Sequence, residues 1–302
     1  MKPIIQLVQD YLKICQLQKR LDEKTLKAYR IDLRQFCEFL SCHQAELTRE
    51  TLSDYIMDMN QHFKPRSVKR KIASIKALCH YLEDEEILKE NPFRKLSIGM
   101  REPIQLPRTI PLRIVENILE AAYAQINCSV GIQEQWAVRD VAVIELLFAT
   151  GVRVSELCKL DVSDVDLVEG IVRIHGKGAK ERILQIGNAD VLAILCRYST
   201  LVSRSDSVPF FVNRRGNRIS EQSVRLILRR YEKAAAGQLH ITPHMFRHSF
   251  ATLLLEEDVD IRYIQKMLGH SSIVTTQIYT HVATAKQKEI LSTKHPRNKL
   301  LV

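Results

Sequence analysis

The sequence lacks several features that would indicate a secreted, membrane-bound or metal-stabilised protein. Its 302 residues contain no apolar run that approaches a membrane span, which needs roughly 20 residues. The opening MKPIIQLVQDYLK meets Gln and Asp too soon for a signal peptide. The seven cysteines are scattered without a C-x-x-C pair, which favours reduced thiols over disulfides or a zinc cluster. We therefore expect a soluble cytoplasmic protein.

Glycine is also absent from the first 90 residues. Apolar residues recur there at helical spacing, which predicts four helices, over residues 3–18, 22–40, 48–60 and 64–82. Short loops between them indicate a small bundle over residues 1–90. Four prolines and the first glycine follow within residues 91–111, and proline disfavours helix. We therefore predict an extended linker over 91–111.

Residues 112–302 form the second predicted domain. A helix near 112–125 and the apolar stretch 139–160 come first. GIVRIHG and ERILQIG then alternate around a Gly-Lys-Gly turn, as the strands of a β-hairpin do. After residue 188 the pattern is helical, except for a short strand-and-turn passage in VPFFVNRRGNRIS. The predicted fold class is mainly α with a small β-hairpin, divided into a helical domain and a mixed α/β domain.

The charge balance favours a polyanionic partner. Lys+Arg 45 against Asp+Glu 35 gives a net charge of +10 and a pI near 9.3, which favours nucleic acid over a membrane surface, with a merely basic enzyme as the alternative. The fourth predicted helix carries six cations within thirteen residues that contain no acid. Such a run is either a solvated face or a surface for phosphates. Its candidate DNA-binding residues are Lys64, Arg66, Lys69, Arg70, Lys71 and Lys76.

The stretch TPHMFRHSF, residues 242–250, raises a choice between a metal site and an anion site. His244 and His248 have the i, i+4 spacing of two zinc ligands on one helix face. However, a proline separates His240 from the helix, and no Glu follows His244 as H-E-x-x-H requires. A Thr-Pro pair marks a helix start. On that helix, His244 and Arg247 lie three residues apart and therefore on the same face. We therefore predict an anion site, with phosphate as the anion and no metal.

Three further passages carry reactive residues, each with a plainer alternative. His270 and Tyr279 lie in LGHSSIVTTQIYTHV, where a tyrosine is often only a half-buried packing residue. In ATGVRVSEL, Arg153 has Glu156 one helical turn later, which serves either a site or simple charge compensation. Lys177, at the tip of the predicted hairpin, would by itself be a solvated turn residue.

Together these passages resemble a known family. ATGVRVSEL, GKGAKER, HMFRH and LGHSSIVTTQIYTHV match, in order and spacing, the tyrosine recombinase (phage integrase) family, and they are most similar to its Xer-type members. TLKAYRIDLRQFCEFL and SVKRKIASIKALCHYL resemble the core-binding domain of that family, and the terminal HPRN resembles the Xer tail. The resemblance covers nearly the whole chain. It implies a SAM-like core-binding domain at 1–90 and a catalytic domain at 112–302. The pattern of residues 284–294 allows a short amphipathic tail helix, with a frayed tail as the alternative.

The resemblance implies that three residues bind the scissile phosphate. Arg153 and Arg247 would contact its two non-bridging oxygens, where guanidinium groups neutralise the charge that grows in the transition state. His270 would add a hydrogen bond to the same phosphate.

Three other residues would take part in bond formation and proton transfer. Tyr279 would be the nucleophile and form a 3′-phosphotyrosine. A phenol with a pKa near 10 needs a base at neutral pH, and His244 is the candidate. Lys177 would protonate the departing 5′-oxygen. Glu156 would orient its neighbours, and we assign His248 to structure.

The resemblance also implies the partners and the setting. Double-stranded DNA with inverted-repeat core sites is the expected substrate, and a homotetramer on two sites, or a heterotetramer with a paralogue, would pass through a Holliday junction. The tail helix would dock on a neighbouring protomer. No cofactor, metal or ATP is expected, and the setting is the bacterial cytoplasm, at the nucleoid. Integration or excision of a mobile element and chromosome or plasmid resolution both fit.

The sequence departs from the family pattern at two positions, and three other functions compete with recombination. Many relatives have Gly where Asp258 stands, and Asp tolerates the left-handed conformation better than most residues. Leu253 replaces a frequent His, which we interpret as a packing change. A type IB topoisomerase would use the same chemistry without partner subunits. A non-catalytic DNA-binding relative would have lost an arginine or the tyrosine, and a metal-dependent nuclease would be sensitive to chelators.

Overall fold

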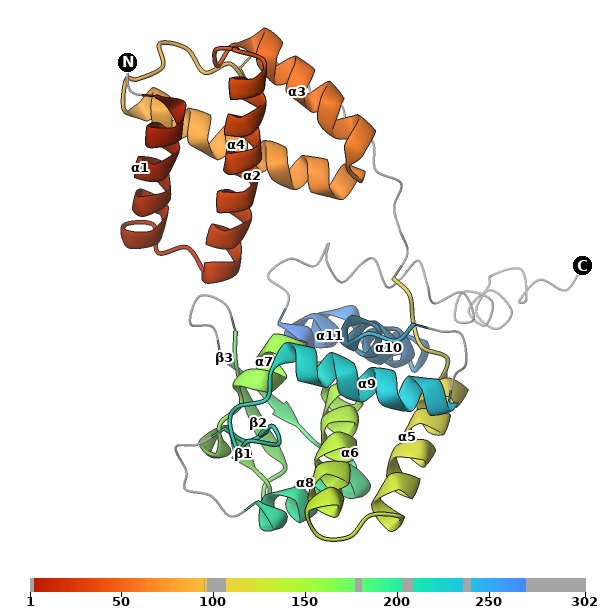
Figure 1. Ribbon diagram of the computed structural model, residues 1–302. Helices are drawn as coiled ribbons and strands as arrows, with labels where there is room; N and C mark the ends of the chain where they lie inside the picture. The colour runs from red at the N-terminus through yellow and green to blue at the C-terminus, as the bar shows by residue number, and fades with distance from the viewer. Residues whose placement is uncertain are drawn as a thin grey trace, which may run out of the picture. The chain divides into compact units, whose positions relative to one another are not determined.

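The computed structural model describes residues 3–94, 96, 107–176, 181–202, 209–235 and 240–269. The chain divides into two compact units, Met1–Ile104 and Gln105–Val302 (Figure 1), and this division falls within the predicted linker. The predicted tail helix at 284–294 lies outside the described residues. No helix of the described part is both long and apolar enough to cross a membrane.

The first unit contains the four predicted helices. They are α1 (Ile4–Leu17), α2 (Glu23–Cys42), α3 (Arg49–His62) and α4 (Pro65–Asp84). Local chemistry sets the starts of three of them. Asp22 and Thr48 each accept a hydrogen bond from a backbone N–H of the first turn of α2 and α3, and Pro65 occupies the first position of α4. The four-helix prediction is confirmed.

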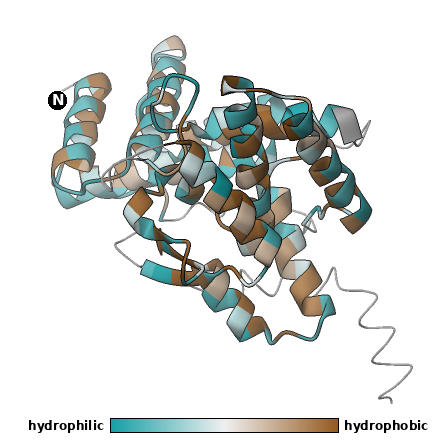
Figure 2. Cartoon of the chain, turned by 90° about the horizontal axis from the view of Figure 1, so that it is seen from below, coloured by the Kyte–Doolittle hydropathy of each residue, from teal (hydrophilic) through white to brown (hydrophobic). Residues whose placement is uncertain are grey.

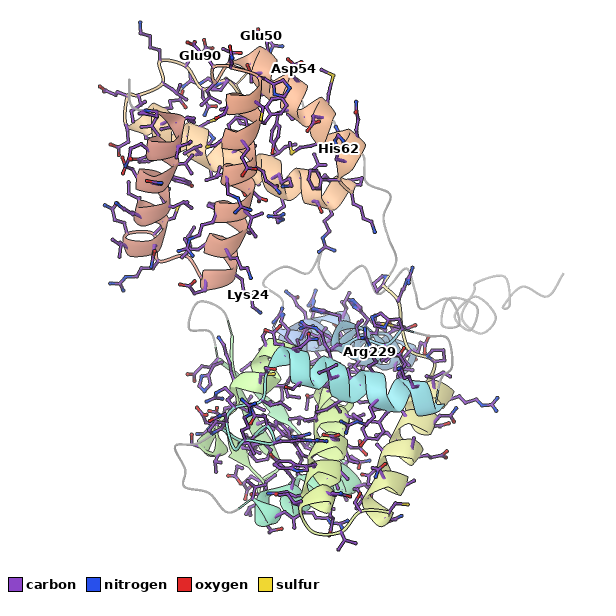
Figure 3. The ribbon with its side chains drawn as sticks, viewed as in Figure 1. Lys24, Glu50, Asp54, His62, Glu90 and Arg229 are labelled. Atoms are coloured by element: carbon purple, nitrogen blue, oxygen red, sulfur yellow. The ribbon has the colours of Figure 1, made fainter. Side chains whose placement is uncertain are left out.

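Apolar stripes on these helices form the core of the first unit. Tyr11, Leu33, Phe36, Met59 and Leu78 are all at most 1% exposed, and burying a side chain of this size contributes about 1.5–3 kcal/mol. Figure 2 shows hydrophobic and hydrophilic residues on different faces of the same helices. The residues of this unit that Figure 3 labels are charged or titratable and exposed, as expected for the outer faces.

The second unit is built around one buried helix. Its helices are α5 (Leu112–Asn127), α6 (Ile132–Thr150), α7 (Val154–Lys159), α8 (Ala189–Leu201), α9 (Glu221–Ala235), α10 (Pro243–Glu256) and α11 (Ile261–Leu268), with a short 3₁₀ turn, η1 (Val162–Asp164). Every residue of α6 from Ala137 to Leu147 is buried. This helix packs against α5, α8, α9 and α10, because it is apolar on nearly all sides.

A small antiparallel sheet completes the second unit. It consists of β1 (Val165–Asp166), β2 (Ile171–His175) and β3 (Glu181–Gln185), in that order. The predicted hairpin of β2 and β3 is confirmed, with Ile174 opposite Arg182 and His175 opposite Glu181. Strand β1 was not predicted. In the described part of VPFFVNRRGNRIS, the expected strand is replaced by two isolated bridges, Asp161 with Pro209 and Val212 with Arg218.

Left-handed residues end helices at three turns of the second unit. Gly151 ends α6 with φ 60°, and Gly269 ends α11 with φ 65°. A Cβ on Gly151 would lie 2.6 Å from the ring of Phe250, so both conformation and close packing require glycine there. Asp258 takes φ 62° between α10 and α11, which confirms that aspartate accommodates this turn.

Candidate active site

Arg247 lies within the first two turns of α10 and is almost fully buried, at 4% exposure. The helix begins at Pro243, as predicted, although the side chain of Thr242 forms no capping hydrogen bond. Nη1 of Arg247 donates to the carbonyl of Gly151 at 2.8 Å, and Nη2 donates to the carbonyl of Leu268 at 2.6 Å. The guanidinium therefore joins the ends of α6 and α11.

Arg153 follows the same α6 turn and is the N-cap residue of α7. Its side chain is 36% exposed, and Nη1 donates to Oε1 of Glu156 at 2.8 Å. The backbone N–H of Arg153 donates to Oε2 of Glu156 at 2.9 Å. The i, i+3 pair therefore forms, and Glu156 contacts both the side chain and the backbone of Arg153.

A second arginine, Arg182 of β3, also binds Glu156. Its Nη1 and Nη2 donate to Oε1 and Oε2 at 3.0 and 2.7 Å. Burial raises the pKa of Glu156, but hydrogen bonds from Arg182 and Arg153 outweigh it and lower the pKa to about 2. Sequence reasoning missed Arg182, although the quoted motif GKGAKER ends on it.

Positive charge from several elements converges on His244, which lies exposed in the first turn of α10. Nearby protein atoms partly desolvate the ring, and Arg247, Arg225 and Arg153 add positive charge, so its pKa falls below the ordinary 6.5. Its surroundings therefore favour the neutral form of the ring over the charged form. The structure thus brings together Arg153, Arg247 and His244 from the predicted catalytic set.

In the described part of the chain, His248 and His240 do not form a metal site with His244. Burial, His244 and Arg247 lower the pKa of His248 to about 4. His240 lies ahead of the helix, with its Nδ1 3.8 Å from a carboxylate oxygen of Glu232 on α9. Across the described residues, no three His, Cys, Asp or Glu side chains are placed to hold a metal ion.

The remaining predicted catalytic residues, Lys177, His270 and Tyr279, lie outside the described residues. Both strands of the hairpin are described, and at their loop end His175 bridges two carboxylates. Its Nε2 is 2.8 Å from Oδ1 of Asp164 and its Nδ1 is 3.1 Å from Oε1 of Glu181. The hydrogen bond to Asp164 raises the pKa of His175. This anchor of the hairpin was not predicted.

The basic run of α4 divides into exposed and buried members. Five of the six candidate DNA-binding residues are exposed, namely Lys64, Arg66, Lys69, Arg70 and Lys76. Lys71 is 2% exposed, and its ammonium lies 3.5 Å from a carboxylate oxygen of the buried Asp32 and 4.5 Å from the ring centroid of Phe63. The prediction that Lys71 belongs to a phosphate-facing surface is therefore wrong. The ammonium of Lys71 is kept buried by a carboxylate on α2, which the sequence pattern of α4 alone does not reveal.

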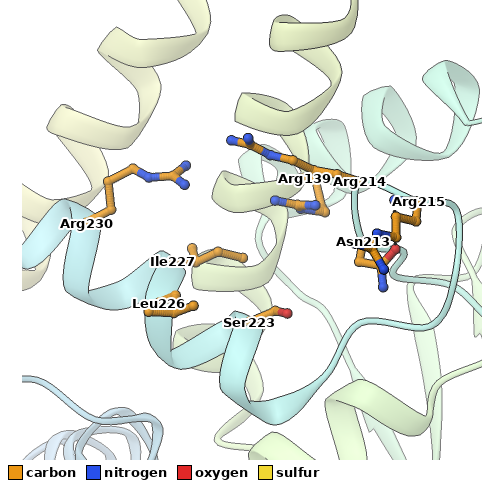
Figure 4. Close-up of a pocket in the computed structure, with 8 residues that line it drawn as sticks. All are labelled: Arg139, Asn213, Arg214, Arg215, Ser223, Leu226, Ile227 and Arg230. Carbon is orange, nitrogen blue, oxygen red and sulfur yellow. Dashed lines mark hydrogen bonds between the residues drawn. The ribbon is translucent and has the colours of Figure 1, made fainter.

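A pocket of about 350 Å³ lies between α9, α6 and the 213–217 turn (Figure 4). It was not predicted from the sequence. Four of its lining residues are arginines, Arg139, Arg214, Arg215 and Arg230. The buried Asp140 accepts a 2.6 Å hydrogen bond from Arg139 and a 2.8 Å hydrogen bond from Arg230. One carboxylate thus binds two guanidinium groups, and the lining has a net positive charge.

Known proteins match both units of this fold. Residues 114–286 match the model of the phage integrase family, and residues 8–86 match the phage integrase N-terminal SAM-like domain. A tyrosine recombinase of Agathobacter rectalis is 54% identical over 294 residues, covering 96% of each chain. Tyrosine recombinase XerC of Thermodesulfovibrio yellowstonii is 35% identical over 302 residues, covering 97% of each.

Solved structures show the same fold at lower identity. XerH recombinase in a post-cleavage complex with a palindromic difH substrate has a TM-score of 0.73 and 22% identity, covering 93% of this chain and 83% of that one. A lambda integrase tetramer on a Holliday junction has a TM-score of 0.69 and 18% identity, covering 91% and 76%. The chain therefore belongs to the phage integrase family of tyrosine recombinases, which cleave and rejoin DNA strands at specific sites.

Proposed function

We propose that this recombinase cleaves DNA through Tyr279 and holds the scissile phosphate between Arg153 and Arg247. The observation that carries the proposal is the convergence of these two arginines at the turn that ends α6, with His244 within reach of the charge of both. A pair of guanidinium groups neutralises a phosphodiester that gains charge in its transition state. His270 adds a hydrogen bond to the same phosphate.

The proposed cleavage step balances without an external reagent. The phenolic oxygen of Tyr279 forms a bond to phosphorus while the bond from phosphorus to the 5′-oxygen breaks. The phenol proton passes to His244, whose surroundings favour the unprotonated ring that a general base requires. Lys177 gives a proton to the departing 5′-oxygen. The phosphotyrosine keeps the energy of the phosphodiester, so a second 5′-hydroxyl rejoins the strand without ATP or metal.

Two basic surfaces support double-stranded DNA as the partner. The exposed cations of α4, excluding Lys71, form one in the first unit. The arginine-lined pocket beside α9 forms the other in the second unit. Both present guanidinium or ammonium groups suited to backbone phosphates.

The expected assembly is a tetramer on two inverted-repeat sites, which exchanges strands through a Holliday junction, with the segment 284–294 docking on a neighbouring protomer. The lambda integrase tetramer on a Holliday junction supports this proposal through the shared fold. The biological setting we propose is the bacterial nucleoid. Integration or excision of a mobile element and chromosome or plasmid resolution are its two candidate outcomes.

The test captures the covalent intermediate. Purified protein is incubated in EDTA with nicked duplexes cut from the host genome, and DNA that stays bound in SDS is recovered and sequenced. Recovery of one sequence class, lost in Tyr279→Phe, is the expected result. Tyr263→Phe, which changes an exposed tyrosine of α11, is the matched control. Adducts without sequence preference would indicate a topoisomerase, and DNA binding without adducts would contradict the proposal.

A further inference from the structure

We propose that Arg182 is a positioning residue for strand cleavage, acting through Glu156 on Arg153. The inference rests on the proposed function, because it concerns how the phosphate-binding arginines are held. Arg182 is only 12% exposed at its side chain, and three of its N–H groups have defined acceptors. Two donate to the carboxylate of Glu156, and Nε donates to the carbonyl of Met267 at 2.8 Å.

These contacts place Arg182 between the same two segments that Arg247 joins. Arg182 holds the carbonyl of Met267, and Arg247 holds the next carbonyl along, that of Leu268. At its other end, Arg182 reaches α7 through Glu156, and Arg247 reaches the turn before α7 through Gly151. Two guanidinium groups from different elements therefore fix the end of α11 against the turn that carries Arg153.

Charge gives Arg182 a second effect. Glu156 is 7% exposed and accepts hydrogen bonds from both Arg153 and Arg182. Two guanidinium groups against one carboxylate leave an excess of one positive charge beside the phosphate site. Without Arg182, Glu156 and Arg153 would form a neutral pair. The carboxylate would then draw the Arg153 guanidinium away from the phosphate, which weakens its contribution to the transition state.

The surrounding backbone is shaped to admit this guanidinium. Gly269 ends α11 with φ 65°, and a Cβ at that position would lie 3.0 Å from Nη1 of Arg182. A glycine therefore serves both the left-handed conformation and the close approach of the arginine. Arg182 also lies on β3, the strand that follows the hairpin turn with Lys177, so a single side chain links β3, α7 and the end of α11.

The experiment measures the rate of covalent adduct formation on the recovered nicked duplex at saturating protein, so that affinity does not enter. We expect Arg182→Gln to slow this rate about 100-fold, as small misplacements of catalytic groups do. The conservative variant Arg182→Lys should keep the DNA affinity and the melting temperature of the wild type. Its rate of adduct formation should lie between those of the wild type and Arg182→Gln. Arg173→Gln, an exposed arginine of β2, is the matched control and should leave the rate unchanged.

A modified substrate separates positioning from a general loss of structure. A methylphosphonate at the scissile position replaces one charged oxygen with a neutral methyl group, so cleavage depends less on the charge of Arg153. The deficit of Arg182→Gln should shrink at least tenfold on this substrate. An equal deficit on both substrates, or an undiminished rate on the phosphodiester, would overturn the inference. If Arg182→Gln fails to fold, the double variant Glu156→Gln, Arg182→Gln removes both charges, and it should fold yet remain slow.

A separate readout does not require turnover. The Nε–H resonance of Arg153 in ¹⁵N NMR spectra should shift or broaden in Arg182→Lys and remain in place in Arg173→Gln. Wild-type protein that forms no adduct would contradict the proposed function, and the NMR comparison would still decide whether Arg182 sets the orientation of Arg153. An unchanged resonance would contradict the inference alone.

Discussion

The carbonyl of Gly151 accepts a 2.8 Å hydrogen bond from Nη1 of Arg247, which lies 96 residues further along the chain. Gly151 ends α6, and Arg153 follows two residues later as the N-cap of α7. The placement of one arginine of the proposed phosphate site therefore depends on the turn that precedes the other. A change in this turn should affect both arginines together.

Gly151→Ala tests this dependence. Alanine at φ 60° is strained, and its Cβ would lie 2.6 Å from the ring of Phe250. We expect a loss of about 2–4 kcal/mol in the free energy of unfolding, measured in urea, and slower adduct formation. Gly131→Ala is the matched control, because Gly131 has φ 61° but nothing within 4 Å of the added Cβ. It should lose stability through backbone strain alone and keep its rate of adduct formation; slower adduct formation in Gly131→Ala would show that strain in any glycine turn, and not the clash with Phe250, accounts for the effect.

Glu156→Gln should make stability less dependent on pH. The folded-state pKa of Glu156 is about 2, against an ordinary 4.5. A carboxyl group with a depressed pKa stabilises the fold fully above its unfolded pKa, and this contribution disappears as pH falls through the folded pKa. It amounts to about 3 kcal/mol at pH 7. The difference in unfolding free energy between wild type and Glu156→Gln should therefore shrink between pH 5 and pH 2.

Chemical denaturation at a series of pH values measures this difference. Glu169→Gln, which changes an exposed glutamate, is the control and should track the wild type throughout. A gap between wild type and Glu156→Gln that stays constant down to pH 2 would show that Glu156 contributes by packing and not by charge.

Periodicity and capping were sufficient to predict the helices of the first unit. Thr48 and Pro65 start α3 and α4 because their effects are local to one turn of chain. The hairpin was predictable for the same reason, since alternation and turn chemistry both lie within one short stretch. Strand β1 spans two residues, which is too short for any alternation to be visible in the sequence.

The errors and omissions arise where charges from different segments meet. Lys71 is surrounded by cations along α4, but its counter-charge, Asp32, lies on α2. The importance of Arg182 depends on Glu156 and on a carbonyl of α11, and no spacing rule connects these three segments. Motif resemblance predicted the reactive residues and gave Glu156 an orienting role, but it did not point to Arg182.

The division of the α4 cations predicts opposite effects for two neighbouring lysines. Lys69→Gln removes an exposed positive charge, so the slope of log affinity against log salt should fall by up to about 0.9, with stability unchanged. Lys71→Met should leave the slope unchanged and lower the unfolding free energy by about 2 kcal/mol, because Asp32 loses a charged hydrogen-bond donor. DNA binding at several salt concentrations and urea denaturation measure both quantities. Identical behaviour of the two variants would contradict the assigned orientations.

The arginine-lined pocket predicts a DNA contact that is separate from the cleavage chemistry. Arg214 and Arg215 are exposed on the 213–217 turn, whereas Arg139 is 5% exposed and binds the buried Asp140. The double variant Arg214→Gln, Arg215→Gln should weaken DNA binding at least tenfold and reduce the salt slope by about 1–2, because backbone phosphates lose two cations. At saturating protein its cleavage rate should match that of wild type.

Arg197→Gln is the control for this pocket. It removes an exposed arginine of α8 that is paired with Glu134 at 2.7 Å and does not line the pocket. Arg139→Gln should differ from both variants, because it removes a guanidinium partner of the buried Asp140 and should therefore lower the unfolding free energy by about 3 kcal/mol. If Arg197→Gln weakens DNA binding as much as the double variant, net charge and not the pocket determines affinity. A selective loss in the double variant would place a backbone phosphate between α9 and the 213–217 turn.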